Sequence, residues 1–395
     1  MRRAGAALAL VMLALALVST LGPVKGPDPG TFQWCVVCGE RGSADALANM
    51  LLFLPLAIGL VWSGASAPRT ILLAFLLSAS LEFVQLRLVP GRDATLGDVV
   101  WNTVGAALGV GLAHWFPIRR RSGVRAMAAA VLVLAALGVS GLLLRPYFPP
   151  TAYYGQVLAD LRMYDWYRGR LLRADIAGIA LPSGQLADSR SVRERLAEGA
   201  TLSVRAIAGP RTPKVGPIFS IFDAAHREIL FVGNDRGDLV LRVNTRATDV
   251  RLDRPDLRWR GAMAGVVPGD TLRVEVRRAR GAYCLRLNGR ERCDLAPSAG
   301  RMWALLQFAP HLPVAVQAIL DGVFLVLLGL PVGLVFRRSA TGYAAVTLAL
   351  AGLLVLPPLM GLAPTPLLQV VALACGMLGG ALLPHDEVLS GVRAG

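Results

Sequence analysis

The stretch ALANMLLFLPLAIGLVWS, residues 46–63, decides the class of fold. It carries no charged side chain, and a helix needs about 20 mainly apolar residues to cross a bilayer. Working outward from it, apolar stretches of similar length recur along the chain, at roughly residues 4–22, 70–89, 97–116, 126–144, 314–336, 342–362 and 365–384. We therefore predict an α-helical transmembrane bundle of about eight spans.

Composition agrees with a membrane protein and argues against a nucleic-acid-binding one. Of the 395 residues, 54% are apolar, and the formal net charge is +15. The basic residues are nearly all arginine, and they form no stripe with interleaved aromatic side chains, which is the pattern typical of nucleic-acid binding. We expect membrane lipid to be a partner and nucleic acid not to be one.

The arginines orient the predicted spans. They occur at every second loop between the apolar stretches, in the groups Arg2 and Arg3, Arg69, residues 119–121 with Arg125, Arg337 and Arg338, and Arg393. Cytoplasmic loops are enriched in Arg and Lys, so these loops and both termini are predicted to be cytoplasmic. The first stretch follows basic residues as a signal peptide would. Its end, VSTLG, is a poor cleavage site, and we interpret the stretch as a retained helix.

Residues 146–312 differ from the rest and are predicted to form an all-β domain on the extracytoplasmic side. Short runs rich in β-branched and aromatic residues alternate there with turn signals such as Pro-Gly-Asp and Asn-Gly. This pattern is typical of a sandwich or jelly roll. The expected strands are residues 201–208, 218–222, 228–232, 239–243, 271–277, 284–287 and 302–308.

Two pairs of cysteines are placed for disulfides. In a two-residue hairpin centred on Asn288-Gly289, paired residue numbers sum to 577, as those of Cys284 and Cys293 do. Counting outward from the turn makes them a non-hydrogen-bonded pair, with Cα atoms ~4.5 Å apart and within disulfide range, rather than two unrelated thiols. Cys35 and Cys38 stand in the string WCVVC, which matches the thioredoxin active site. No strand–helix unit surrounds it, so we interpret the pair as a local disulfide or structural thiols.

Polar side chains gather at the outer ends of three predicted spans and in one loop between them. Residues spaced three or four apart share one face of a helix. Three such pairs and one adjacent loop pair are Asp45 and Asn49, Glu82 and Gln85, Asp98 and Asn102, and Arg92 and Asp93. Ionisable residues inside a membrane are costly and mark candidate functional sites. We predict that these eight residues, called the polar cluster below, form a ligand-binding site.

The same region resembles a known family. Its ordered motifs are Asp45-x3-Asn49 followed by FLPL at 53–56, Ser80-Leu-Glu82-x2-Gln85, and Arg92-Asp93-x4-Asp98-x3-Asn102-x2-Gly105-x3-Gly109. Over residues 30–115 this pattern resembles the VanZ-like family of bacterial membrane proteins, which is named for a member associated with resistance to the glycopeptide teicoplanin. The resemblance implies a multi-pass protein of the bacterial inner membrane. Ala57 stands where many relatives carry glycine, a change between small residues.

The predicted β domain resembles the laminin-G/concanavalin A-like jelly rolls. The likeness rests on the strand patterns FSIFD at 219–223, GDLVLR at 237–242 and LRLNG at 285–289. Such folds often bind glycans, some through calcium. The sequence has no dense Asp/Asn cluster for calcium and lacks the Glu-x-Asp-x-x-Glu strand motif of the related glucanases. We expect no metal, no cofactor and no hydrolase activity in this domain.

The favoured hypothesis is a protein that binds the headgroup of a lipid-linked or cell-wall glycan at the polar cluster, with the β domain presenting a second glycan-facing surface. Arg92 is the expected partner of a phosphate or carboxylate. Glu82 is expected to pair with Arg92 or to serve as an acid/base group. The alternatives are a network that only joins helices, an envelope-lipid-modifying enzyme using Glu82 or Asp98, and a transporter or flippase. Binding is favoured over catalysis because the sequence has no metal-ligand spacing and no nucleophile elbow.

These inferences divide the chain into five predicted parts. They are the first transmembrane helix and outer loop at 1–29, the VanZ-like transmembrane domain at 30–118, the fifth helix at 119–145, the β domain at 146–312, and three C-terminal helices at 313–395.

Overall fold

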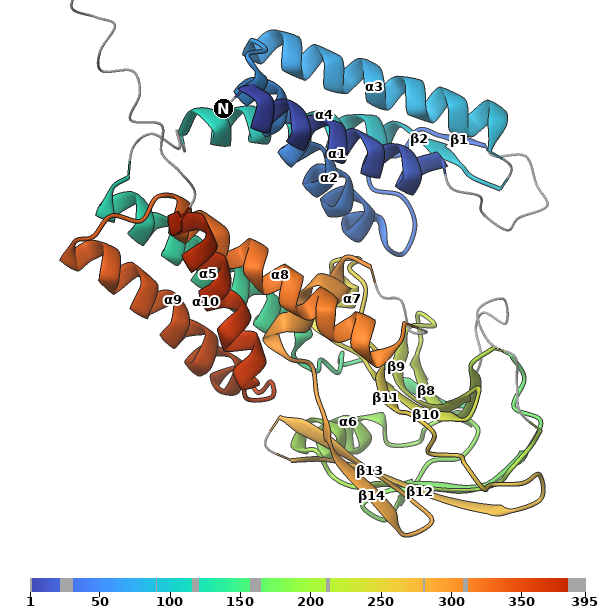
Figure 1. Ribbon diagram of the computed structural model, residues 1–395. Helices are drawn as coiled ribbons and strands as arrows, with labels where there is room; N and C mark the ends of the chain where they lie inside the picture. The colour runs from blue at the N-terminus through green and yellow to red at the C-terminus, as the bar shows by residue number, and fades with distance from the viewer. Residues whose placement is uncertain are drawn as a thin grey trace, which may run out of the picture.

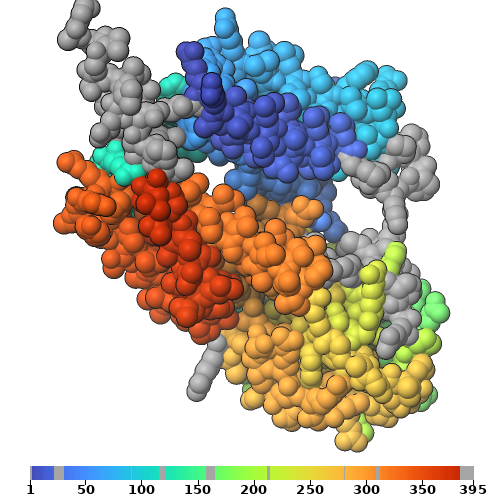
Figure 2. Space-filling model, viewed as in Figure 1, coloured from blue at the N-terminus to red at the C-terminus, as the bar shows by residue number. Residues whose placement is uncertain are grey.

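The structure is a computed structural model that describes residues 2–21, 31–89, 91–115, 121–156, 165–210, 214–279, 281–307 and 312–382. Its long helices form two bundles, and a β sandwich lies at one end of them (Figure 1). The space-filling view shows the same division, with the first bundle in blue, the sandwich mainly in green to light orange, and the helices after it in orange and red (Figure 2).

The first bundle contains four helices, each close to a predicted span. They are α1 (Arg2–Leu21), α2 (Gly42–Ser63), α3 (Ala67–Leu88) and α4 (Leu96–Trp115). Small residues let their backbones approach closely, as helix packing in membranes requires. A methyl group added to Gly105 of α4 would lie 2.7 Å from the Cα of Met50 in α2, and one added to Gly59 of α2 would lie 2.7 Å from the backbone nitrogen of Ala9 in α1. The small-x3-small spacing of Gly105 and Gly109 therefore marks a packing surface.

The second bundle is built from helices on both sides of the β domain in the sequence. They are α5 (Gly123–Leu144), α8 (Val314–Leu334), α9 (Ala340–Leu359) and α10 (Leu367–Leu382). Among the described residues, seven helices are long and apolar enough to cross a membrane, whereas α10 has 16 residues and ends at the last described residue. Seven predicted spans therefore have matching helices, and the eighth stays a prediction.

The β domain consists of two six-stranded antiparallel sheets. The strand order is β11-β10-β9-β8-β3-β6 in one sheet and β14-β13-β12-β7-β4-β5 in the other. Side chains from both sheets, such as Ile218 of β8 and Val204 of β7, are buried in one hydrophobic core. The bounds are β3 (Tyr153–Gly155), β4 (Arg170–Ile176), β5 (Ile179–Ala180), β6 (Gly184–Gln185), β7 (Leu202–Ile207), β8 (Gly216–Asp223), β9 (Glu228–Asp235), β10 (Asp238–Val243), β11 (Leu257–Trp259), β12 (Thr271–Ala279), β13 (Ala282–Leu287) and β14 (Arg290–Leu295).

The strand predicted at 302–308 is wrong. Residues Ala299–Leu305 form a 3₁₀ helix, η1. Its backbone and side chains bind the second bundle instead of a sheet, because Gly300 N–H donates to Gln369 of α10 (3.0 Å) and the Trp303 indole donates to Asp321 of α8 (2.8 Å). The apolar side chains of η1 that resembled a strand lie in the core shared with α5 and α8.

The predicted hairpin register is confirmed near its turn. Leu287 pairs with Arg290 and Leu285 with Arg292, as the sum of 577 requires, and the register shifts only beyond them. Asn288 and Gly289 both have positive φ, 48° and 87°, which a two-residue type I′ turn needs. Cys284 and Cys293 form a disulfide with Cα atoms 3.8 Å apart.

Several short elements of the sandwich escaped the sequence analysis. Helix α6 (Ser189–Glu198) follows Asp188, whose carboxylate accepts from Ser191 N–H at 2.9 Å, and this N-cap is a signal that the sequence carries. Strands β3, β5, β6 and β11 have only two or three residues each. Such lengths are too short to show an alternating pattern, so their place in the sheets depends on their neighbours.

Candidate functional site

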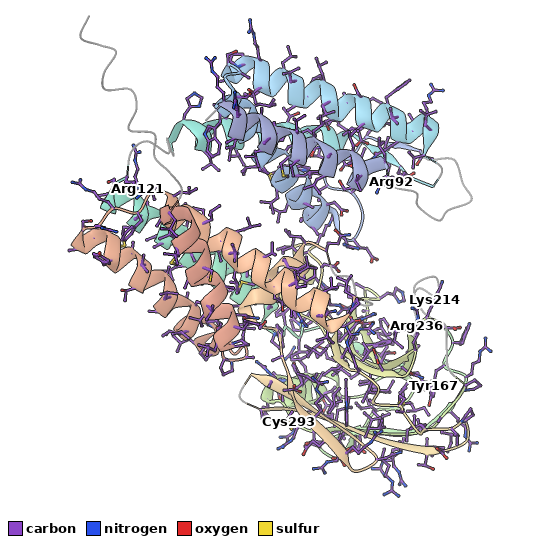
Figure 3. All side chains as sticks on the ribbon, in the orientation of Figure 1. Arg92, Arg121, Tyr167, Lys214, Arg236 and Cys293 are labelled. Carbon is purple, nitrogen blue, oxygen red and sulfur yellow. A yellow bond between two sulfur atoms is a disulfide. The ribbon has the colours of Figure 1, made fainter. Side chains whose placement is uncertain are left out.

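The polar cluster lies at the end of the first bundle where α1 and α3 finish and α2 and α4 begin. Arg92 is at this end, beside the short parallel pair β1 (Phe32–Gln33) and β2 (Ala94–Thr95) (Figure 3). The structure joins the helices here by hydrogen bonds between side chains, since the Asn49 amide of α2 donates to Asp98 of α4 (2.7 Å). Glu82, Gln85 and Asn102 are buried, and Asp98 is half-buried.

Thr95 connects Glu82 with Asp98, and the sequence analysis missed it. Its backbone N–H donates to Glu82 Oε2 (2.7 Å), and its hydroxyl accepts from Asp98 N–H (2.9 Å). Thr95 is thus the N-cap of α4, and the spacing Thr95-x-x-Asp98 is the capping signal that could have identified it. Thr95 therefore links the Glu82 carboxylate of α3 to the first turn of α4, which contains Asp98.

Asn102 completes a group of four side chains between α3 and α4. Its amide donates to the hydroxyl of Ser78 (2.8 Å), which is fully buried and was not predicted as a site residue. Ser78 lies four residues before Glu82, and Asp98 lies four residues before Asn102, so each pair shares one helix face. Within the described structure, the Asn102 side-chain oxygen is buried and has no hydrogen-bond partner. A buried polar atom without a partner is unusual enough to mark a candidate ligand contact.

Arg92 is positioned differently from the sequence-based expectation. Its guanidinium donates to the carbonyls of Thr20 (2.6 Å) and Ser19 (2.8 Å), in the last turn of α1. Those carbonyls carry the negative end of the helix dipole, which attracts a cation. Among the described residues Arg92 forms no salt bridge with Glu82, and its guanidinium is already engaged by α1. Among the described residues the structure thus shows no ion pair between Arg92 and Glu82, and the expected role of Arg92 toward an anionic ligand stays a prediction.

The remaining predicted site residues lie at the edge of the cluster. Gln85 donates to the same Thr20 carbonyl as Arg92, at 2.9 Å. Asp45 is exposed at the start of α2. Asp93 is separate from the other carboxylates and ties the residues before α2 to the loop before α4. It accepts from Thr31 N–H (2.8 Å), from the Thr31 hydroxyl and from the Gln33 amide. The hydrogen bonds from Thr31, then Gln33, lower the pKa of Asp93 below its usual range.

The cluster is rich in hydrogen-bond acceptors, and three of its eight members are buried. Thr95 contacts both the Glu82 carboxylate and the backbone N–H of Asp98, and the nearby Arg92 guanidinium donates to carbonyls of α1. A cavity of about 30 Å³ exists elsewhere, between the end of α5 and the sandwich, lined by residues that include Leu144, Arg278 and Tyr283. It has room for about one water molecule. The chemistry therefore favours the polar cluster over the cavity as a binding site.

The β sandwich contacts the first bundle beside the cluster. Ala44 N–H, in the first turn of α2, donates to the Arg251 carbonyl (3.2 Å), and Arg41 forms a salt bridge with Asp253 (2.9 Å). No side chain among the described residues caps α2. The first N–H groups of a helix lack intrahelical partners, so a loop of the sandwich satisfies one of them. The two parts are thus joined at the end of the bundle that holds the cluster.

Comparison with known proteins finds a family similarity within the first bundle. Residues 12–117 match the family model described as VanZ/LLP1, and the match contains all eight residues of the polar cluster. The β sandwich and the second bundle lie outside the matched residues. No curated protein matches the chain, and no solved structure does.

Proposed function

We propose that this VanZ-like membrane protein binds the headgroup of a lipid-linked or cell-wall-derived glycan at the polar cluster. The observation that carries the proposal is the buried side-chain oxygen of Asn102, which has no hydrogen-bond partner within the described structure and lies one helical turn after Asp98, at the end of the bundle that also holds Glu82. A polar group at membrane depth is costly unless it serves a ligand or a partner.

The chemistry of the cluster selects the kind of headgroup. Carboxylates and amide oxygens accept hydrogen bonds, and the Arg92 guanidinium is engaged by α1. Sugar hydroxyls and ammonium groups donate hydrogen bonds, whereas phosphate oxygens accept them and would be repelled by Glu82 and Asp98. The cluster therefore binds the hydroxyl- or amine-bearing part of the ligand, and a phosphate linkage lies outside it.

The location of the site follows from the proposed topology. Both termini are on the cytoplasmic side, and the polar cluster and the β sandwich are on the extracytoplasmic side of the bacterial inner membrane. The structure supports this arrangement because the sandwich contacts the end of α2 where the cluster lies. The two antiparallel sheets agree with a laminin-G/concanavalin A-like jelly roll that offers a second glycan-facing surface. A link to teicoplanin resistance belongs to this proposal through the family resemblance.

Mass spectrometry of lipids co-purified with the full-length protein in mild detergent tests the proposal. We expect the double variant Glu82→Gln/Asp98→Asn to retain about tenfold less glycolipid than the wild type, equivalent to ~1.4 kcal/mol of binding energy. Asp321→Asn is the matched control, because Asp321 is a buried carboxylate of the second bundle that accepts a hydrogen bond from the Trp303 indole. Equal glycolipid in all three folded proteins would refute the site. A loss of anionic phospholipid alone would refute the proposed headgroup class.

A further inference from the structure

The disulfide between Cys35 and Cys38 closes a short exposed loop beside the polar cluster. The sulfur atoms join two residues that are separated by only Val36 and Val37. Cys35 is exposed and Cys38 is half-buried. Trp34, directly before the disulfide, is 77% exposed and stacks edge-on against Phe32 with ring centroids 4.8 Å apart. A protein can therefore reach both the Cys35 side of the disulfide and an aromatic side chain next to it.

The loop also connects α4 with the β sandwich. Its consecutive carbonyls, from residues 35, 36 and 37, each accept a hydrogen bond from a different group. Gly97 N–H in the first turn of α4 donates to Cys35 (3.2 Å), and the Trp101 indole of α4 donates to Val36 (2.8 Å). The Arg251 guanidinium of the β sandwich donates to Val37 (3.2 Å).

The cross-link holds these carbonyls in place. With the ring closed, residues 35–38 have few conformations available, so little entropy is lost when their carbonyls bind partners. Opening the ring restores backbone freedom to the segment that contacts both α4 and Arg251. The sulfur–sulfur bond therefore stabilises the contact between the VanZ-like bundle and the sandwich.

We infer that Cys35–Cys38 is a thiol–disulfide exchange site for a dithiol partner, and that its reduction loosens the contact between the first bundle and the β sandwich. A thiolate of the dithiol attacks the exposed Cys35 sulfur and forms a mixed disulfide, and Cys38 leaves as a thiolate that takes up a proton. The second thiol of the partner then closes its own disulfide and releases Cys35. Two electrons and two protons pass from the dithiol to the cysteine pair.

The second disulfide provides an internal comparison. Cys284 and Cys293 join neighbouring strands; Cys284 is only 6% exposed, whereas Cys293 is exposed. The β13–β14 ladder pairs residues on either side of this disulfide, Leu285 with Arg292 and Tyr283 with Leu295, so the two strands stay together when the bond is open. If this disulfide were opened, its two thiols would re-form it readily. We therefore expect it to resist exchange at dithiol concentrations that open Cys35–Cys38.

Thiol mapping tests the exchange site. The full-length protein is titrated with dithiothreitol under native conditions, free thiols are alkylated, and peptides are identified by mass spectrometry. We expect Cys35 and Cys38 to be labelled at dithiol concentrations at least tenfold below those that label Cys284 and Cys293. Simultaneous labelling of both pairs, or labelling only after unfolding, would overturn the exchange site.

Hydrogen exchange tests the structural consequence. The amides of Gly97 and Ala44 donate to Cys35 and to Arg251, respectively, so they report on the two contacts. We expect exchange in peptides containing these amides to become several-fold faster after selective reduction, and likewise in Cys35→Ser/Cys38→Ser. Cys284→Ser/Cys293→Ser is the control and should leave these peptides unchanged. Selective reduction without faster exchange at either amide would overturn the proposed loosening. This measurement uses the reduced wild-type protein, so it does not depend on whether the variants fold.

Discussion

Arg92 shows that the chemistry of a side chain does not by itself determine which group it binds. A planar guanidinium suits phosphate and carboxylate, which is why the sequence favoured an anionic ligand. In the structure the last turn of α1 offers two carbonyls within 2.8 Å, and Gln85 donates to one of them as well. Arg92 therefore closes the end of α1, and its two hydrogen bonds to carbonyls there account for its position.

A double-mutant cycle distinguishes the two roles of Arg92. Arg92→Ala should lower the free energy of unfolding by about 2 kcal/mol, because hydrogen bonds from a charged group are lost. Arg92 and Gln85 share the Thr20 carbonyl, so Arg92→Ala and Gln85→Leu should be coupled by more than about 0.5 kcal/mol. Arg92→Ala and Glu82→Gln should be additive within about that value. Thermal unfolding in detergent measures both cycles. If Arg92 were coupled to Glu82 and not to Gln85, the prediction would be wrong and an ion pair between Arg92 and Glu82 would be supported.

At the scale of elements, glycine spacing determines how closely the helices approach. Gly105 and Gly109 of α4 lie on the backbone of α2, and in the second bundle Gly329 and Gly333 of α8 face Gly376 and Gly380 of α10. Without water between helices, close backbone packing is a main source of stability in a membrane. The polar cluster depends on this packing, because Asn49 of α2 reaches Asp98 of α4 only when the two helices are in contact.

Two glycines of the same helix make a matched test of this packing. Gly105→Ala should destabilise the first bundle by about 1–3 kcal/mol, because the added methyl group would overlap the backbone of Met50. Gly111→Ala should be neutral or stabilising by up to about 1 kcal/mol, because nothing lies within 4 Å of the added group and alanine favours a helix. Unfolding in a denaturing detergent compares them. Equal effects would mean that α4 does not pack on α2 through Gly105.

At the scale of the whole molecule, the β sandwich is attached to both bundles at one end. Helix η1 fixes it to α8 and α10, and the loop containing Arg251 and Asp253 fixes it to α2. The chain enters the sandwich from α5 and leaves it toward α8, at the end of the second bundle where α5 finishes and α8 begins. All of these attachments are compatible with one membrane orientation, in which the sandwich and the polar cluster lie on the same side.

Reporter fusions test that orientation. A reporter that is active only outside the cytoplasm should be active when fused after residue 40, 95, 200 or 363, and silent after residue 67, 122, 339 or 394. The physical reason is that arginine-rich loops are retained in the cytoplasm. A silent fusion at 200 together with an active one at 122 would reverse the topology and place the polar cluster in the cytoplasmic leaflet.

Features whose partners lie close in sequence could be derived from the sequence alone. Apolar length predicted the long helices, and helical spacing placed Asp98 and Asn102 on one face of α4. The Asn288-Gly289 turn set the register around it, because a two-residue turn leaves one way to count outward. Residues 30–115 were recognisable because their motifs keep a fixed order and spacing, and the family match covers residues 12–117.

Only the tertiary structure decided features whose partners are distant in sequence. Arg92 and the Thr20 carbonyl are 72 residues apart, and their contact depends on how α1 packs beside α3, which no spacing within either helix encodes. Residues 302–307 have the composition of a strand, but the hydrogen bonds of Asp321 and Gln369 select a 3₁₀ helix for most of that segment. In each case the local pattern allows several partners, and the packing of remote elements places one of them within hydrogen-bond distance.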